Sequence, residues 1–182
     1  VCVSNYLKDN YKLNTKIHVV GSNSLKKTIY NKGFILDDEN AKVVVVGLDN
    51  KISYNKIDIA SKLIRKGAKL IGTNQDRLYP TNDGFKPGAG TIIECIRLAS
   101  YDAKCHYIGK PNPYFINSAI KYLKLNKKNV IMIGDQLETD ILAANKAKIS
   151  SVLVTTGVKN IDMKIKPTIT VNSLMELPIS KK

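Results

Sequence analysis

The sequence has few of the features that mark exported, disulfide-stabilised or membrane-spanning proteins. It contains no tryptophan. Its three cysteines are odd in number and lack Cys-x-x-Cys spacing. Such cysteines fit reduced thiols better than a disulfide framework. No apolar run is long enough to span a bilayer, and no segment has the pattern of a secretory signal. We therefore expect a cytoplasmic protein without a membrane partner.

Acidic residues are scarce as well, with 15 Asp and Glu against 29 Lys and Arg and a net charge of +14. A strongly basic surface attracts the phosphates of nucleic acids. Only three of the basic residues are arginines, however, and no aromatic cluster accompanies the lysines. Proteins that read bases depend on arginine forks and aromatic stacking platforms. We interpret the lysines as solvated surface and expect no nucleic-acid partner.

Hydrophobic residues make up 43% of the chain, which is enough for a folded core. Short β-branched runs alternate along it with amphipathic helical segments, and this alternation predicts an α/β fold in which helices cover a parallel sheet. The segment 84–90 is predicted to be a loop. The predicted strands are 17–20, 43–46, 69–72, 107–108, 130–133, 152–154 and 168–171. The predicted helices are 24–31, 56–66, 91–99, 114–124 and 138–147.

Two carboxylates follow the predicted strand 130–133. Asp135 comes directly after Gly134, and Asp140 lies five residues further on. In open α/β sheets, ligands bind at the carboxyl ends of the strands. Two acids at such an end suit Mg²⁺, which is usually shared between carboxylates and a substrate phosphate. The alternative is structural, with Asp135 ending the strand and Asp140 capping a helix.

Lys110 also follows a predicted strand, and it stands between Gly109 and Pro111. A lysine fixed in this way, 25 residues before Asp135, suits a cation that neutralises a phosphate or a neighbouring carboxylate. A solvated surface charge is the competing interpretation.

The segments Gly-Lys-Pro-x-Pro at 109–113 and Gly-Asp-x-x-x-Thr-Asp-Ile at 134–141 resemble the third and fourth motifs of the haloacid dehalogenase (HAD) phosphatases. Segments 71–90, 155–158 and 174–178 are similar to the p-nitrophenylphosphatase or NagD-like branch, which carries an α/β cap. The resemblance implies a partial Rossmann-like HAD core with a parallel sheet, plus an α/β cap domain. Its divisions would be a core helix remnant at 1–13, the cap at 14–106 and the carboxyl-terminal half of the core at 107–182.

The same resemblance implies a Mg²⁺-dependent hydrolase that acts on a small phosphorylated metabolite through an aspartyl-phosphate. Asp135 would bind Mg²⁺, Lys110 would neutralise the phosphate or the nucleophile, and Asp140 would orient Lys110 or the water shell of the metal.

The cap would supply the substrate specificity. Tyr79, which precedes a proline, matches a cap position that contacts substrate in related phosphatases. Asn74 and Asp76 belong to the same segment and are expected to bind substrate together with Tyr79 and Lys110, and the alternative role of Asn74 and Asp76 is to shape a turn. Loop packing is an equally good interpretation of Tyr79.

The chain departs from the family pattern in one respect. It contains neither the Asp-x-Asp-Gly motif, whose first Asp attacks phosphorus, nor a Ser/Thr-Asn-Asn turn, and it begins at Val1. We expect an amino-terminally truncated phosphatase that is inactive alone, in preference to a natural pseudoenzyme. The other hypotheses are a non-catalytic binding or oligomerisation module, with a homodimer formed through the cap, and nucleic-acid binding through the lysines.

Overall fold

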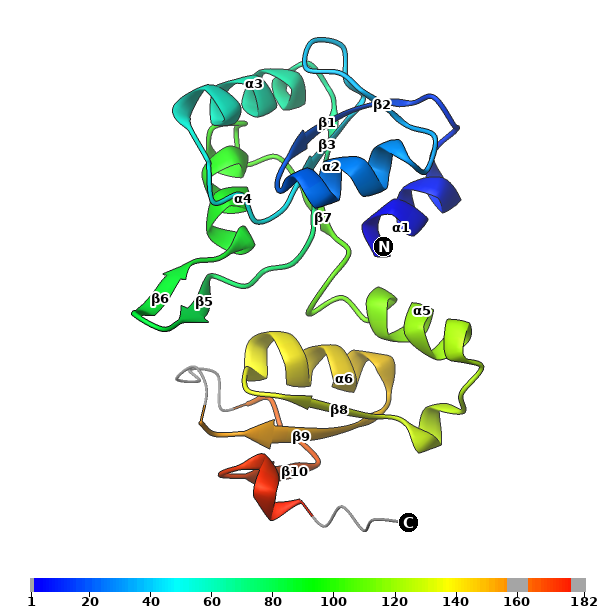
Figure 1. The fold of residues 1–182 in the computed structure, drawn as a ribbon, viewed down its shortest axis with the longest axis vertical. Helices are drawn as coiled ribbons and strands as arrows, with labels where there is room; N and C mark the ends of the chain where they lie inside the picture. The colour runs from blue at the N-terminus through cyan, green and yellow to red at the C-terminus, as the bar shows by residue number, and fades with distance from the viewer. Residues whose placement is uncertain (1, 157–163, 178–182) are drawn as a thin grey trace. The chain divides into compact units, whose positions relative to one another are not determined.

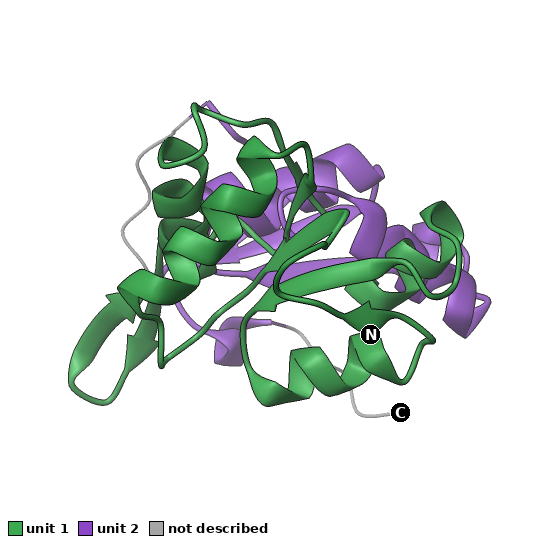
Figure 2. Cartoon of the chain, turned by 90° about the horizontal axis from the view of Figure 1, so that it is seen from above, with its two compact units in different colours: residues 1–109 green, residues 110–182 purple. Residues whose placement is uncertain are grey.

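The structure, a computed structural model, describes residues 2–156 and 164–177. The chain divides into two compact units, residues 1–109 and residues 110–182 (Figure 2). Both contain a parallel sheet with helices, so the predicted α/β class is confirmed. The first unit takes in the helix α1 (Cys2–Asn10) together with residues 14–106. The assignment of residues 1–13 to the core and of 14–106 to a cap stays a prediction.

The first unit is built on a five-stranded parallel sheet in the order β2-β1-β3-β4-β7 (Figure 1). Its central strand β3 is a run of four valines, all fully buried. A strand that is buried on both faces reads as a continuous β-branched run, which is why the sequence predicts β3 so clearly. The strands are β1 (Lys16–Val20), β2 (Ile35–Leu36), β3 (Val43–Val46), β4 (Lys69–Gly72) and β7 (Cys105–Tyr107).

Helices cover both faces of this sheet. The helices α3 (Tyr54–Arg65) and α4 (Ala89–Leu98) pack their apolar residues against alternate strand residues such as Val44 and Val46. Figure 1 shows α1 and α2 (Asn23–Tyr30) on the side away from α3 and α4. The side chain of Ser53 caps α3 by accepting a hydrogen bond from the Lys56 N–H. Because β3 and β4 are parallel neighbours, the loops that follow them emerge at the same edge of the sheet.

The predicted loop at 84–90 is wrong. Residues Leu78–Thr81 form β5 and residues Gly84–Pro87 form β6, and the two strands make an antiparallel hairpin. The turn ends at Gly84, whose φ of +113° favours glycine. Every residue of β6 is exposed. The hairpin therefore lacks the apolar alternation by which a half-buried strand is normally recognised.

The second unit contains a parallel sheet in the order β10-β9-β8, formed by β8 (Ile131–Gly134), β9 (Ser150–Val154) and β10 (Ile169–Val171). The helices α5 (Tyr114–Leu123) and α6 (Leu142–Ala147) pack over it. Their core residues are Ile116, Ile120, Ala143, Ala144 and Ala147.

Two features of the second unit differ from a regular α/β layer. Residues Leu137–Ile141, expected to open an α-helix, instead form a π-helical turn ahead of α6. On its outer edge β8 has no partner strand within the described residues, and Ile131 and Ile133 are exposed there. Short 3₁₀ turns occur at Lys127–Asn129 and Leu174–Glu176. None of the described helices is both long enough and apolar enough to cross a membrane.

Candidate active site

Lys110 and Asp140 form an ion pair in the second unit, with 2.9 Å between Lys110 Nζ and Asp140 Oδ1. The Asp140 side chain is 5% exposed and that of Lys110 is 26% exposed. A carboxylate so deeply buried needs a charged or hydrogen-bonding partner, because its desolvation is costly. The pair therefore fixes the ammonium group of Lys110 beside the carboxyl end of β8.

The π-helical turn determines where Asp140 points. The backbone N–H groups of Asp140 and Ile141 both donate to the carbonyl oxygen of Gln136, at 2.9 and 3.2 Å. The Gln136 N–H in turn donates to Asp140 Oδ2 at 3.3 Å. Both carboxylate oxygens of Asp140 are thus engaged, and no side chain caps α6. One oxygen of Asp140 thus pairs with Lys110, and the other accepts from the N–H of the residue that precedes the turn. Single π-turns of this kind occur frequently at functional sites.

Gly134 makes room for this arrangement. A Cβ atom at this position would lie 2.3 Å from the Cβ of Asp140 and 2.5 Å from its Oδ2. Real Cβ contacts are never so short, so any other residue would displace Asp140 or the end of β8. The next residue, Asp135, is half-buried at the carboxyl end of the strand. The chain thus places Asp135 next to the glycine on which the Asp140 side chain packs.

The residues present suit a magnesium ion only in part. Among the described residues, no three His, Cys, Asp or Glu side chains are grouped so that they could hold a metal ion. Mg²⁺ keeps several of its waters and often takes only one or two protein carboxylates. Asp135 alone is compatible with that chemistry. Asp140 suits an orienting role better than direct ligation, because both of its oxygens already accept hydrogen bonds.

The predicted cap residues lie in the first unit. Asn74 Oδ1 accepts a hydrogen bond from the Asp76 N–H at 3.2 Å, and the Asp76 carbonyl accepts one from the Gly90 N–H at 2.9 Å. These bonds shape the loop after β4. Tyr79 lies on β5 and donates from Oη to Asn50 Oδ1 at 3.3 Å. Tyr79 also lines a cavity of about 310 Å³.

Sequence reasoning missed a buried ion pair beside this cavity. Asp49 is 6% exposed, and its Oδ2 lies 2.7 Å from Lys56 Nζ, while its Oδ1 accepts from the Lys51 N–H. Burial raises the pKa of Asp49, but the bonds from Lys56 and Lys51 outweigh it, so the pKa lies below its usual value. Asp49 lies three residues after the end of β3, whereas Asp135 follows β8 directly. The rule about strand ends could still have found it.

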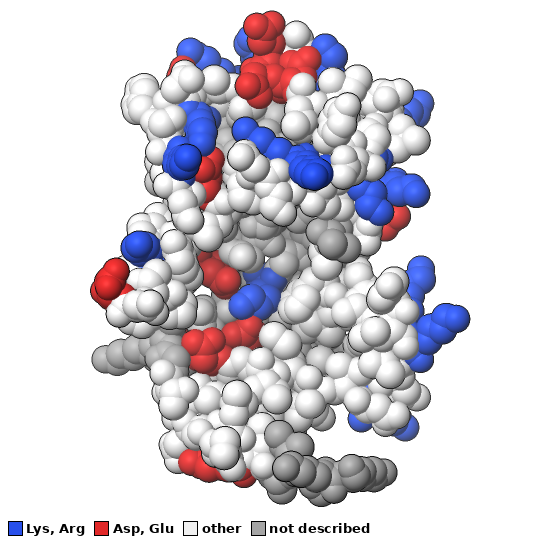
Figure 3. Space-filling view, in the orientation of Figure 1, with Lys and Arg blue, Asp and Glu red and all other residues white. Residues whose placement is uncertain are grey.

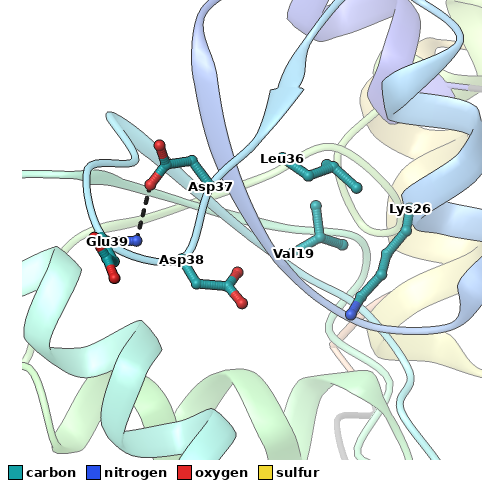
Figure 4. Close-up of a pocket in the computed structure, with 6 residues that line it drawn as sticks. All are labelled: Val19, Lys26, Leu36, Asp37, Asp38 and Glu39. Atoms are coloured by element: carbon teal, nitrogen blue, oxygen red, sulfur yellow. Dashed lines mark hydrogen bonds between the residues drawn. The ribbon is translucent and has the colours of Figure 1, made fainter.

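The acidic loop 37–39 borders a second cavity of the first unit, about 480 Å³ in volume (Figure 4). Asp37 pairs with Lys16 at 2.8 Å and accepts from the Glu39 N–H, and these bonds lower its pKa to about 2. Asp38 lies 2.8 Å from His18 Nδ1. Two of these three carboxylates thus serve local structure.

Lysine and arginine side chains are spread over the surface. In Figure 3 they lie at separate points of the visible face, interspersed with acidic groups, and do not gather into one patch. A nucleic-acid footprint is usually a clustered basic stripe. This face of the molecule does not show one.

Comparisons with known proteins agree with the motifs. The family described as HAD-hydrolase-like matches residues 107–177. An acid sugar phosphatase from Staphylococcus haemolyticus is 35% identical over 87% of this chain and 60% of its own length. The chain thus spans about three fifths of the length of this curated relative.

Solved structures extend the match to nearly the whole chain. A single mutant of the thermostable NPPase from Geobacillus stearothermophilus is 40% identical, with a TM-score of 0.87 over 97% of this chain and 71% of that one. The glycerol phosphate phosphatase from Mycobacterium tuberculosis, in complex with magnesium, is 25% identical, with a TM-score of 0.85 over 94% of this chain and 54% of that one. The chain belongs to the HAD-like hydrolase family, among whose structures p-nitrophenylphosphatase and NagD are its neighbours.

Proposed function

We propose that the protein is a Mg²⁺-dependent phosphomonoester hydrolase that acts on a small phosphorylated metabolite. The observation that carries the proposal is the ion pair between Lys110 and the buried Asp140, near the carboxyl end of β8, which Asp135 follows directly. The names of its relatives, acid sugar phosphatase and NPPase, support the same class of reaction.

Three residues of the second unit have distinct roles in this proposal. Lys110 neutralises a phosphate oxygen, and Asp140 keeps the ammonium group in place through their ion pair. Asp135 holds Mg²⁺, which when bound supplies positive charge to the phosphate. Phosphoryl transfer depends mainly on positioning and on electrostatic stabilisation. These residues therefore supply much of what catalysis requires.

The attacking carboxylate is not among the residues of this chain, because no Asp-x-Asp-Gly segment occurs in it. We therefore propose that the 182-residue chain by itself does not hydrolyse phosphomonoesters. The covalent aspartyl-phosphate route requires that carboxylate.

The test compares this chain with a protein that also carries an Asp-x-Asp-Gly segment ahead of Val1, taken from the Geobacillus relative. Release of phosphate from p-nitrophenyl phosphate should require both the added segment and Mg²⁺. In that protein, Lys110→Ala should lower kcat by about 10²-fold or more, the size of effect seen when one electrostatic group is removed. Asp135→Asn should raise the Mg²⁺ concentration needed for half-maximal rate.

Lys121→Ala is the matched control, because Lys121 is an exposed lysine on α5 in the same unit. It should leave the rate unchanged. Near-normal rates in both Lys110→Ala and Asp135→Asn would refute the assignment, as would rapid turnover by the unextended chain.

A further inference from the structure

A cavity of about 310 Å³ lies in the first unit, at the end of the sheet where β3 finishes. This volume is at the lower end of the range for small-molecule sites, about 300–1,000 Å³. The loop after β3, the β5–β6 hairpin and α4 form its walls. The lining residues are Leu48, Asp49, Asn50, Ile52, Tyr79, Lys86, Pro87 and Ile92.

Hydrogen-bond donors gather on one wall. Tyr79 and Lys86 are paired across the hairpin, so both side chains lie on the same face of it. The Tyr79 hydroxyl donates to Asn50 Oδ1, which leaves the Asn50 amide nitrogen available as a donor. Within the described residues, the Lys86 side chain has neither an acidic partner nor a hydrogen bond. The lining of the cavity thus includes an ammonium group and an amide N–H₂.

The one carboxylate on the cavity does not neutralise Lys86. Asp49 is buried and accepts hydrogen bonds from Lys56 Nζ at 2.7 Å and from the Lys51 N–H at 2.9 Å. Lys56 Nζ also donates to the Lys51 carbonyl at 2.8 Å. This network ties the loop that carries Asn50 to α3. Asn50 therefore lies on a loop that is held in place, and Asp49 already has partners other than Lys86.

The remaining walls are apolar. Leu48 and Ile52 are each 37% exposed, and Pro87 and the buried Ile92 complete the surface. A largely apolar cavity with a few placed polar groups is typical of sites for small organic ligands. Such a cavity suits a short carbon skeleton that carries an anion at one end.

We propose that this cavity binds an anionic group, a carboxylate or a phosphate, through Lys86 and Asn50. The ligand class is therefore small organic anions with a short carbon skeleton. Charge-assisted hydrogen bonds from Lys86 would select such ligands over neutral molecules of the same size.

The anion site can be tested on the 182-residue chain without any turnover. D-glycerate and glycerol, which differ by a carboxylate, are titrated into isotope-labelled protein while backbone amide shifts are recorded. Glycerate should shift the amides of Asn50, Tyr79 and Lys86 saturably, and glycerol should not. A parallel titration with methylphosphonate shows whether the site takes phosphate-type anions as readily as carboxylates.

Variants establish that Lys86 provides the binding. Lys86→Gln should weaken glycerate binding at least five-fold, and Lys86→Arg should restore it in part, which also shows that substitution here leaves the fold intact. Lys42→Gln is the charge-matched control, because Lys42 is exposed and precedes β3 at the opposite end of that strand. It should change nothing.

Equal shifts with glycerate and glycerol would overturn the inference, as would undiminished glycerate binding by Lys86→Gln. Saturable, Lys86-dependent glycerate binding in a protein that never hydrolyses phosphomonoesters would support the anion site and refute the phosphatase proposal.

Discussion

Asp140 Oδ1 lies 2.9 Å from Lys110 Nζ, although the two residues are 30 positions apart in the sequence. The contact arises because Lys110 opens the second unit ahead of α5, while the π-helical turn after β8 directs the Asp140 side chain toward it. Neither a helix cap nor a solvated surface lysine would require these groups to meet. The pair therefore favours a functional interpretation of both residues.

A double-mutant cycle measures the strength of this contact. Lys110→Met and Asp140→Asn should each destabilise the protein, because the first removes the cation that pairs with a buried carboxylate and the second removes the charge of that carboxylate. The double variant should be less destabilised than the sum of the two, with a coupling energy of about 1–2 kcal/mol, within the range for residues in direct contact. Urea unfolding of the four proteins gives this value. Strict additivity would show that the two charges do not interact.

Gly134→Ala tests the close approach between β8 and Asp140. The added Cβ would meet the Asp140 side chain at 2.3–2.5 Å, so the strand end or the carboxylate must move. We expect a loss of about 1–3 kcal/mol in the free energy of unfolding, which is the usual cost of overpacking. Ser150→Ala is the control, because Ser150 is exposed on β9 and pairs with the far end of β8. A loss no larger than that of the control would contradict the packing described here.

The Asp49–Lys56 pair makes the stability of the first unit depend on pH. The pKa of Asp49 in the folded state lies below the ordinary value of 3.8 for a carboxyl group of this type. The stabilisation is therefore complete above about pH 4 and is lost as the pH falls through the folded-state pKa. Asp49→Asn should cost about 1–3 kcal/mol at pH 7, because it removes a charged acceptor from buried donors.

The pH dependence of that difference is the sharper measurement. The gap in unfolding free energy between the unmodified protein and Asp49→Asn should narrow below pH 4, where the carboxyl group becomes protonated. Asp83→Asn is the control, since Asp83 is exposed in the hairpin turn and should show no gap at either pH. A gap that stays constant between pH 7 and pH 3 would argue against the ion pair.

Much of the fold could be predicted because buried parallel strands carry their own signature. The valine run of β3 and the segment 69–72 of β4 have the predicted bounds. The β5–β6 hairpin was missed because its strands are largely exposed and its pattern carries no apolar face. The π-helical turn was missed because the choice between an i→i+4 and an i→i+5 bond depends on how the turn packs on β8.

The two candidate sites also differed in how far their residues could be predicted from the sequence. Lys110, Asp135 and Asp140 follow directly from the positions of strand ends, and their catalytic roles stay predictions. Asn50 and Lys86 could not be found from the sequence, because their place on one cavity depends on the unpredicted hairpin. Tyr79 reaches Asn50 across 29 residues only once β5 and β6 have paired.

The outer edge of β8 is the last feature with a measurable consequence. Ile131 is 49% exposed and Ile133 is 42% exposed, and no strand within the described residues pairs with this edge. Open edges with exposed β-branched residues promote association between chains, and natural proteins often protect such edges with lysine. We therefore expect the 182-residue chain to associate as its concentration rises, and Ile133→Lys to suppress that association.

Light scattering over a concentration series measures both effects. Ile35→Lys is the matched control, since Ile35 is 43% exposed on β2, an edge strand of the other unit. If Ile35→Lys suppresses the association and Ile133→Lys does not, the chains associate through the edge of the first unit and not through β8.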